Sequence, residues 1–294
     1  MKEDMAKTKI LLSEVLLFIS GISDEIKDKT NEKILNKGKV IVTGDKIFTK
    51  NEYLAQSFSN KHSFILLLVS AYISVISEII ICFDSPITRF PLRTIMEIAF
   101  KKIPYYLSLS EDGRKQLAAR YWLVNYATLL SSEPNQENQE IYNHLLDILT
   151  SVEEKSIYAK LREQNYLVSE ICKIRKHIFK APTTKIYRES VEPYLLNISG
   201  EVMSFDSITR MVGDQSDFLH DNLPLLQHLK EESSDKTHSF YVSSIIFLTA
   251  NQIVSILSAQ YSLDKEKEIE RLRDKMLLVG KALFNCVQNT RPSF

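Results

Sequence analysis

Residues 64–83 read FILLLVSAYISVISEIIICF, a run of about 20 mostly apolar residues that is long enough to cross a bilayer as a helix. Glu78 lies inside this run, and a carboxylate at the centre of a membrane costs on the order of 3 kcal/mol on insertion scales. Ser70, Ser74 and Ser77 recur at i, i+4 and i+7, and such a small polar stripe lets a neighbouring helix approach closely. We therefore predict a buried central helix here, with a membrane anchor over residues 64–83 as the alternative.

The composition of the whole chain indicates long helices. Only 7 of the 294 residues are glycine and 8 are proline. Because sheet-rich folds use both residue types in tight turns, a chain this poor in them has few turns to make. The hydrophobic content of 44% and the charged content of 25% are those of a globular protein with a sizeable core. Lys plus Arg number 37 and so do Asp plus Glu, so no net charge attracts nucleic acid or an anionic membrane.

We predict an all-α fold, a multi-helix bundle with a short N-terminal β-hairpin. The hairpin is expected at residues 39–48, KVIVTGDKIF, where Val40, Val42 and Ile47 surround a turn at Gly44. The predicted domains are an appendage of N-terminal helix plus hairpin at 1–50 and a helical bundle at 51–294. Helical periodicity and helix breakers place the helices at about 4–35, 51–83, 86–109, 111–131, 139–150, 152–179, 186–198, 202–221, 236–261 and 265–289.

Two features are expected to shape the helix predicted at 86–109. Ser85 is a good N-cap, and Pro86 suits a first helical turn, where no backbone donor is needed. Pro104 cannot donate a hydrogen bond to the carbonyl of Phe100, so it predicts a bend in the second half of the helix.

The cysteines indicate a reducing compartment. Cys82, Cys172 and Cys286 are widely spaced, odd in number and form no CxxC pair, which argues against a disulfide framework or a zinc knuckle. We expect ordinary core thiols, a cytoplasmic protein, and no metal or other cofactor. Phosphate-loop, dinucleotide-binding and HExxH motifs are missing from the sequence.

The segment from Ser85 to Lys102 carries the first candidate site. Arg89, Arg93 and Glu97 are spaced i, i+4, i+8 and therefore share one helix face. An arginine and a glutamate one turn apart at the edge of a core should pair. The pair is either a structural brace between helices or a rigid guanidinium that Glu97 aims at a phosphate or carboxylate. The adjoining apolar face consists of Leu92, Ile95, Met96 and Phe100.

A second candidate segment lies around His220. Ser216 and His220 are at i and i+4, and Asp217 and Asp221 share the adjoining face. A Ser-His hydrolase needs a nucleophile on a strained turn, and a metal site needs a second ligand cluster; neither is evident. A metal-free ribonuclease that uses Arg93 and His220, or a histidine that merely hydrogen-bonds into the bundle, stays open. The candidate catalytic residues are Arg93, Glu97 and His220, and the candidate ligand-binding residues are Arg89, Ser216 and Asp217.

Taken together, these two segments resemble a bacterial family, the domain of unknown function 5677. The matching pattern is a long apolar helix, a short break, Arg-x-x-x-Glu at Arg93 and Glu97, and much later Ser-x-x-x-His at Ser216 and His220. The resemblance covers about residues 60–260. It implies an all-helical bundle with these four residues as motif positions, and no particular activity.

A looser similarity is to HEPN-type helical domains, many of which are ribonucleases or partners in defence and toxin–antitoxin systems. Their signature places an arginine four to six residues before a histidine on one helix. Here Arg210 is ten residues before His220, and Arg175 is two before His177, so the spacing departs from that signature.

From these observations we expect a helical binding or regulatory module in which Arg93, Glu97 and His220 converge in a polar centre that holds an anionic ligand or an RNA phosphate. The resemblance alone places it in a bacterial stress or phage-defence system. The alternatives are a metal-independent, toxin-like ribonuclease using Arg93 and His220, and a membrane-attached effector anchored by residues 64–83. A protein partner is expected, RNA and a homo-oligomer are further candidates, and a membrane is not expected.

Overall fold

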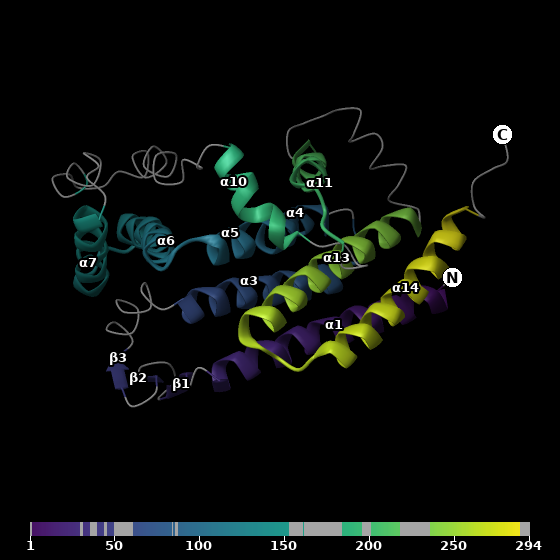
Figure 1. Cartoon of the computed structure of the whole chain (residues 1–294), viewed down its shortest axis with the longest axis horizontal. Coiled ribbons are helices and arrows are strands. Elements are labelled where there is room, and N and C mark those ends of the chain that lie inside the picture. The colour runs from purple at the N-terminus through teal and green to yellow at the C-terminus, as the bar shows by residue number, and fades with distance from the viewer. Residues whose placement is uncertain are drawn as a thin grey trace. The chain divides into compact units, whose positions relative to one another are not determined.

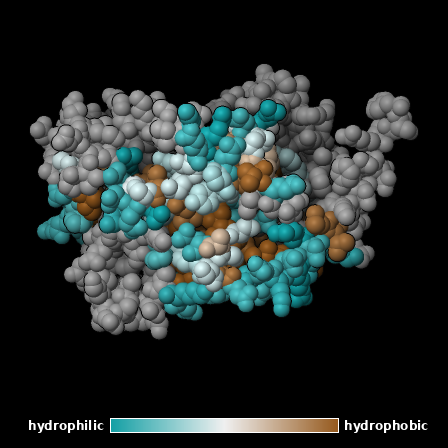
Figure 2. Space-filling view, in the orientation of Figure 1, coloured by the Kyte–Doolittle hydropathy of each residue, from teal (hydrophilic) through white to brown (hydrophobic). Residues whose placement is uncertain are grey.

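A computed structural model of the chain is shown as a cartoon in Figure 1, and Figure 2 shows its surface in the same orientation, coloured by hydropathy. The structure describes residues 2–29, 32–35, 40–43, 46–49, 61–83, 85, 88–152, 161, 184–195, 201–217 and 236–288. Most of these residues are helical, which confirms the predicted all-α class. The helices are α1 (Lys2–Lys29), α3 (Lys61–Ile81), α4 (Arg89–Glu97), the π-helix η3 (Ile98–Lys102), α5 (Ile103–Ser108), α6 (Glu111–Ser132), α7 (Gln136–Val152), α10 (Thr184–Val191), the 3-10 helix η4 (Glu192–Tyr194), α11 (Phe205–Asp217), α13 (Lys236–Tyr261) and α14 (Glu266–Gln288).

Short strands follow the first helix. They are β1 (Glu32–Leu35), β2 (Val40–Thr43) and β3 (Lys46–Thr49), antiparallel in the order β1-β2-β3. The sequence predicts a hairpin of two strands over residues 39–48, with its turn at residues 44–45, which lie outside the described residues. The third strand, β1, lies before that segment and pairs the free edge of β2. A two-stranded ribbon alone is marginally stable in water, and a third strand improves on it.

The chain forms two compact units that interleave in sequence. The first comprises Met1–Ile26, Leu68–Tyr105 and Arg188–Phe294, and the second comprises Lys27–Leu67 and Tyr106–Tyr187. The expected N-terminal appendage is thereby divided, because most of α1 belongs to the first unit and the strands belong to the second. The domain boundary at residue 50 stays a prediction.

In the first unit, α1 and α14 run antiparallel beside each other (Figure 1). The Lys275 ammonium lies 2.6 Å from the Glu14 carboxylate, and the Lys265 ammonium lies 3.0 Å from the Glu25 carboxylate. As the residue number falls on one helix it rises on the other, which fixes the antiparallel direction. Opposite the solvent, α1 buries a row of side chains at alternating steps of four and three residues: Thr8, Leu12, Val15, Ile19, Ile22 and Ile26.

The long helix α13 forms the middle of the first unit. It packs against α14, α4 and η3. The window Tyr241–Tyr261 of this helix is long and apolar enough to span a membrane, but 72% of it is buried inside the protein. Within the core, the Tyr72 hydroxyl on α3 lies 2.8 Å from the Thr249 hydroxyl on α13, and both side chains are fully buried. This hydrogen bond ties α3 to α13.

The apolar helix α3 is one-sided rather than buried all round. Its window Phe64–Ile81 also has the length and apolarity of a membrane span, but 44% of it is buried. The exposed stripe carries Ser70, Ala71, Ser74 and Glu78. Ser70 and Ser74 are therefore open to solvent, and no described helix covers them as the sequence had suggested.

The second unit is built on the helix pair α6 and α7. α6 begins after Ser110, whose hydroxyl accepts a hydrogen bond from the Gly113 backbone N–H at 3.2 Å. The Phe64 ring lies 4.6 Å from the Tyr106 ring and 5.6 Å from the Tyr121 ring, centroid to centroid. The buried core between α6 and α7 includes Ala119, Leu123, Tyr126, Tyr142, Leu145 and Leu149.

Candidate functional site

The helix that carries the first candidate segment begins later than predicted. It starts at Arg89, after Thr88, and the Thr88 hydroxyl donates to the Ser85 carbonyl at 2.7 Å instead of capping the helix. The N-cap of α4 is thus Thr88 and not Ser85, and the Ser85 backbone carbonyl accepts the hydrogen bond from the Thr88 hydroxyl. Pro91 falls in the first helical turn, where a missing N–H costs nothing. The predicted apolar face is confirmed, because four residues are fully buried: Leu92, Ile95, Met96 and Phe100.

A widened turn follows directly. In the π-helix η3 the Ile103 N–H donates to the Ile98 carbonyl, five residues back. The next residue is Pro104, which has no N–H and whose ring would clash with the Phe100 carbonyl in a regular α-helix. A π-turn immediately before the proline moves the carbonyls away from the ring. The bend at Pro104 stays a prediction. Turns of this kind often occur at functional sites.

Arg93 and Glu97 form the predicted ion pair. Arg93 Nε donates to Glu97 Oε1 at 3.1 Å, and the side chains are 33% and 30% exposed. The pairing is thus confirmed, whereas its role stays a prediction. Glu97 occupies only Nε, and among the described residues the two terminal guanidinium nitrogens have no hydrogen-bonding partner. The guanidinium is held at its base and keeps its outer donors available.

Lys101 continues the same row one further turn along the helix. Its side chain is half-buried, and it makes no ion pair or hydrogen bond in the part of the chain that the structure describes. Burial lowers the pKa of its amine, the Glu97 carboxylate opposes that effect, and the Arg93 guanidinium adds to it. Lys101 is not among the residues predicted from the sequence, although its spacing of four from Glu97 and eight from Arg93 indicates the same helix face. We refer to Arg93, Glu97 and Lys101 as the polar row.

The other candidate residues are only partly accessible to description. His220 lies outside the described residues, as do the side chains of Arg89, Ser216 and Asp217, whose backbones belong to α4 and α11. At the level of elements, α11 packs against α4, so the two candidate segments meet in the first unit. The convergence of His220 with the polar row stays a prediction.

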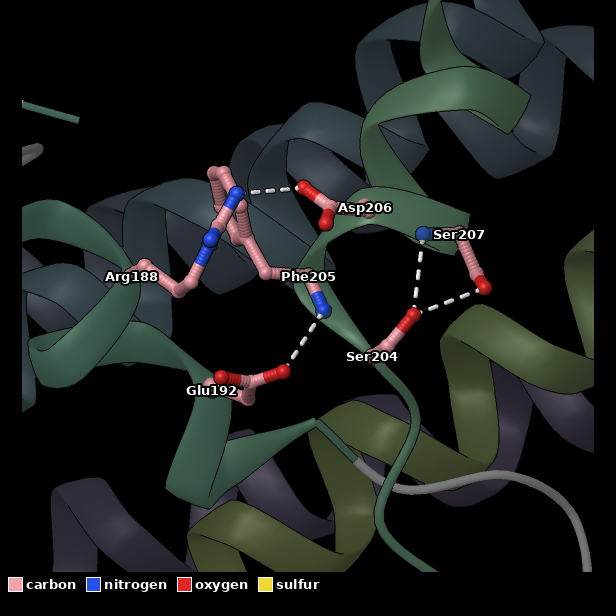
Figure 3. Close-up of polar contacts among 6 residues, drawn as sticks. All are labelled: Arg188, Glu192, Ser204, Phe205, Asp206 and Ser207. Atoms are coloured by element: carbon pink, nitrogen blue, oxygen red, sulfur yellow. Dashed lines mark hydrogen bonds and ion pairs between the residues drawn. The ribbon is translucent and has the colours of Figure 1, made fainter. Parts of the chain in front are cut away.

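A second group of polar contacts, shown in Figure 3, holds the start of α11. The Phe205 N–H donates to a Glu192 carboxylate oxygen at 3.1 Å, and the Ser207 N–H donates to the Ser204 hydroxyl at 3.2 Å. The Ser204 and Ser207 hydroxyls lie 2.8 Å apart. These contacts occupy backbone donors that a helix N-terminus leaves without intrahelical partners. We therefore assign them to capping.

Two long-range contacts connect this capped helix start to its surroundings. Arg188 on α10 donates to the Asp206 carboxylate of α11 at 2.6 Å, an ion pair that is largely exposed (Figure 3). The Gln252 side-chain amide of α13 donates to the Tyr194 carbonyl in η4. Sequence reasoning missed both, because the partners are 18 and 58 residues apart and follow no local spacing rule. The first contact joins α10 to α11. The second joins α13 to η4, whose Glu192 caps α11, and α11 packs on α4.

Metal chemistry finds no support in the part of the chain that the structure describes, where no group of three or more His, Cys, Asp or Glu side chains is arranged to hold a metal ion. Comparisons of the chain with protein-family models, with curated proteins and with solved structures gave no match. The resemblance to the domain of unknown function 5677 stays an expectation from the sequence.

Proposed function

We propose that the chain is a helical binding module whose polar row binds a phosphate group of an anionic ligand or of RNA. The observation that carries this proposal is the 3.1 Å contact between Arg93 Nε and Glu97, which orients the guanidinium and leaves its terminal nitrogens unoccupied by Glu97. A guanidinium edge with two parallel donors matches a phosphate bidentately.

Charge favours the same ligand class. The polar row contains two basic groups and one acid, and α13, which packs against α4 and η3, has no Asp, Glu, Lys or Arg between residues 241 and 261. Lys102, the next residue, adds a further half-buried cation. A local excess of cations beside an apolar helix strengthens an interaction with an anion, because the effective dielectric constant falls near buried surface.

The proposal extends to the biological setting only through sequence. The spacing and number of the cysteines support a cytoplasmic location. The family resemblance alone supports a stress or phage-defence system, in which we expect a protein partner or a homo-oligomer. The chain has no net charge, so its attraction for an anion must come from a local group of cations such as the polar row.

The test is a binding titration with inorganic phosphate by calorimetry, and with a fluorescently labelled single-stranded RNA by anisotropy. Arg93→Gln should weaken binding of both probes by about tenfold or more, because a charge-assisted hydrogen bond contributes about 1.5–3 kcal/mol. Arg271→Gln, which changes an exposed arginine on α14, is the matched control and should bind like the parent. Equal affinities of the two variants would contradict the proposal.

Incubation of the same proteins with RNA addresses the enzymatic alternative. A binding module leaves the RNA intact in gel electrophoresis. Cleavage by the parent protein that disappears in Arg93→Gln and in His220→Ala, with both variants still folded by circular dichroism, would replace the binding module with the ribonuclease.

A further inference from the structure

The amine of Lys101 is chemically unusual among the lysines of the described chain. It is half-buried on a π-turn, it follows a carboxylate and a guanidinium in the polar row, and it has no hydrogen bond or ion pair to any described residue. By contrast, Lys265 and Lys275 are both engaged with carboxylates of α1. Lys101 therefore keeps its nitrogen available for chemistry.

We propose that Lys101 is an acylation site for acyl phosphates, with its Nζ as the nucleophile and Arg93 as the group that holds the phosphate of the donor. The Nζ lone pair attacks the acyl carbon and forms a carbon–nitrogen bond. The bond between that carbon and the phosphate oxygen breaks, and phosphate leaves with the electron pair. The amine loses one proton to the departing phosphate or to water, and the product is an amide.

Two properties of the surroundings support this chemistry. Only the neutral amine is a nucleophile, and burial together with the neighbouring Arg93 charge lowers the pKa of Lys101, so a larger fraction is neutral near pH 7. The phosphate of the acyl phosphate can bind to Arg93, because Glu97 holds the guanidinium in place and its terminal nitrogens suit a phosphate. Lys102 is the half-buried residue at the end of η3, and Lys115 is exposed on α6. Neither belongs to the polar row.

Acylation would also regulate the polar row. It removes the Lys101 charge, so the row falls from two cations and one anion to one of each. Phosphate binding by the row should then weaken. This consequence rests on the proposed function, whereas the acylation itself does not.

The experiment incubates the full chain with acetyl phosphate at pH 7 and follows each lysine by peptide mass spectrometry over time. Lys101 should be acetylated at least several-fold faster than Lys115 and Lys102, because its lowered pKa leaves more neutral amine and Arg93 lies in the same row. The folded state is verified by circular dichroism before and after the reaction. Acetylation of Lys101 no faster than that of Lys102 and Lys115 would overturn the proposal.

A second donor isolates the role of Arg93. The N-hydroxysuccinimide ester of acetate carries no phosphate, so Arg93→Gln should slow the reaction of Lys101 with acetyl phosphate several-fold more than its reaction with this ester. Equal slowing with both donors would overturn the phosphate-holding role. Selective, Arg93-dependent acetylation without measurable phosphate binding in the calorimeter would support the acylation site and sink the proposed function. Phosphate binding without selectivity at Lys101 would do the reverse.

Discussion

Tyr72 and Thr249 show how much one buried hydroxyl pair matters. The Thr249 hydroxyl lies 2.9 Å from the Ile245 carbonyl as well as 2.8 Å from the Tyr72 hydroxyl, so it donates to the backbone and accepts from the tyrosine. Tyr72→Phe removes the donor and leaves no orphaned group, and should cost about 1 kcal/mol of unfolding free energy. Thr249→Val leaves the Tyr72 hydroxyl buried without a partner, and should cost more, about 1–3 kcal/mol. Urea denaturation measures both. A larger loss in Tyr72→Phe than in Thr249→Val would contradict this assignment.

The stability of Tyr72→Phe should also depend on pH differently from that of the parent protein. Burial raises the pKa of Tyr72 far above its ordinary value, and the hydrogen bond with the Thr249 hydroxyl offsets only part of that effect. The folded protein therefore holds the phenol proton at pH values where the unfolded chain releases it. This contribution to stability is complete below pH 10 and declines as the pH rises above 10, the ordinary tyrosine value. Tyr72→Phe should lose stability less steeply between pH 9.5 and 11 than the parent does.

Residue-level prediction from sequence worked where the partners are close in the chain. The Arg93–Glu97 pair follows from a spacing of four on one helix, and the structure confirms it. The Tyr72–Thr249 contact joins residues 177 apart, so no helical spacing rule reaches it. Lys101 lies between these cases, because its spacing from Glu97 and Arg93 was visible in the sequence but its partial burial follows from no spacing rule.

At the scale of elements, two ion pairs set the register of α1 against α14. Glu14→Lys should destabilise the protein by about 0.2–1 kcal/mol, the range for exposed ion pairs, and adding Lys275→Glu should recover most of that loss. The Lys267→Glu variant, at an exposed position on the same helix, should not rescue Glu14→Lys. The measurement is urea denaturation at low salt, repeated at 1 M NaCl, where the coupling should shrink. Equal rescue by both charge changes would show that net charge, not the register, matters.

The boundaries of the elements were less predictable than their existence. The sequence places a helix at 86–109 and a bend at Pro104. The structure begins that helix at Arg89 and places a π-turn directly before Pro104. Both differences come from backbone geometry: the Ser85 carbonyl takes part in the turn before α4, and Pro104 excludes the regular hydrogen bond to Phe100. Propensity rules describe single residues and do not resolve such competition between neighbouring backbone groups.

At the scale of the whole molecule, composition was the most reliable guide. The scarcity of glycine and proline predicted the all-α class, which holds for the described residues. The interleaving of the two compact units was not predictable, because each unit gathers segments that are distant in the chain, such as residues 1–26 and 188–294 in the first. Local sequence patterns do not predict which distant helices pack together.

The exposed surface of α3 decides whether the whole molecule associates with a membrane. Both α3 and α13 have the length and apolarity of membrane spans, but α13 is mostly buried, and the exposed side of α3 carries Ser70, Ser74 and Glu78 between Leu67 and Ile81. A lipid-facing side would be apolar throughout, since a carboxylate in the bilayer costs on the order of 3 kcal/mol. We therefore expect the full chain in the supernatant after detergent-free lysis and ultracentrifugation. Glu78→Leu removes the only charged side chain between residues 64 and 81 and should shift part of the protein to the pellet, because it enlarges an exposed apolar surface. Recovery of the parent protein in carbonate-washed membranes would instead establish residues 64–83 as an anchor.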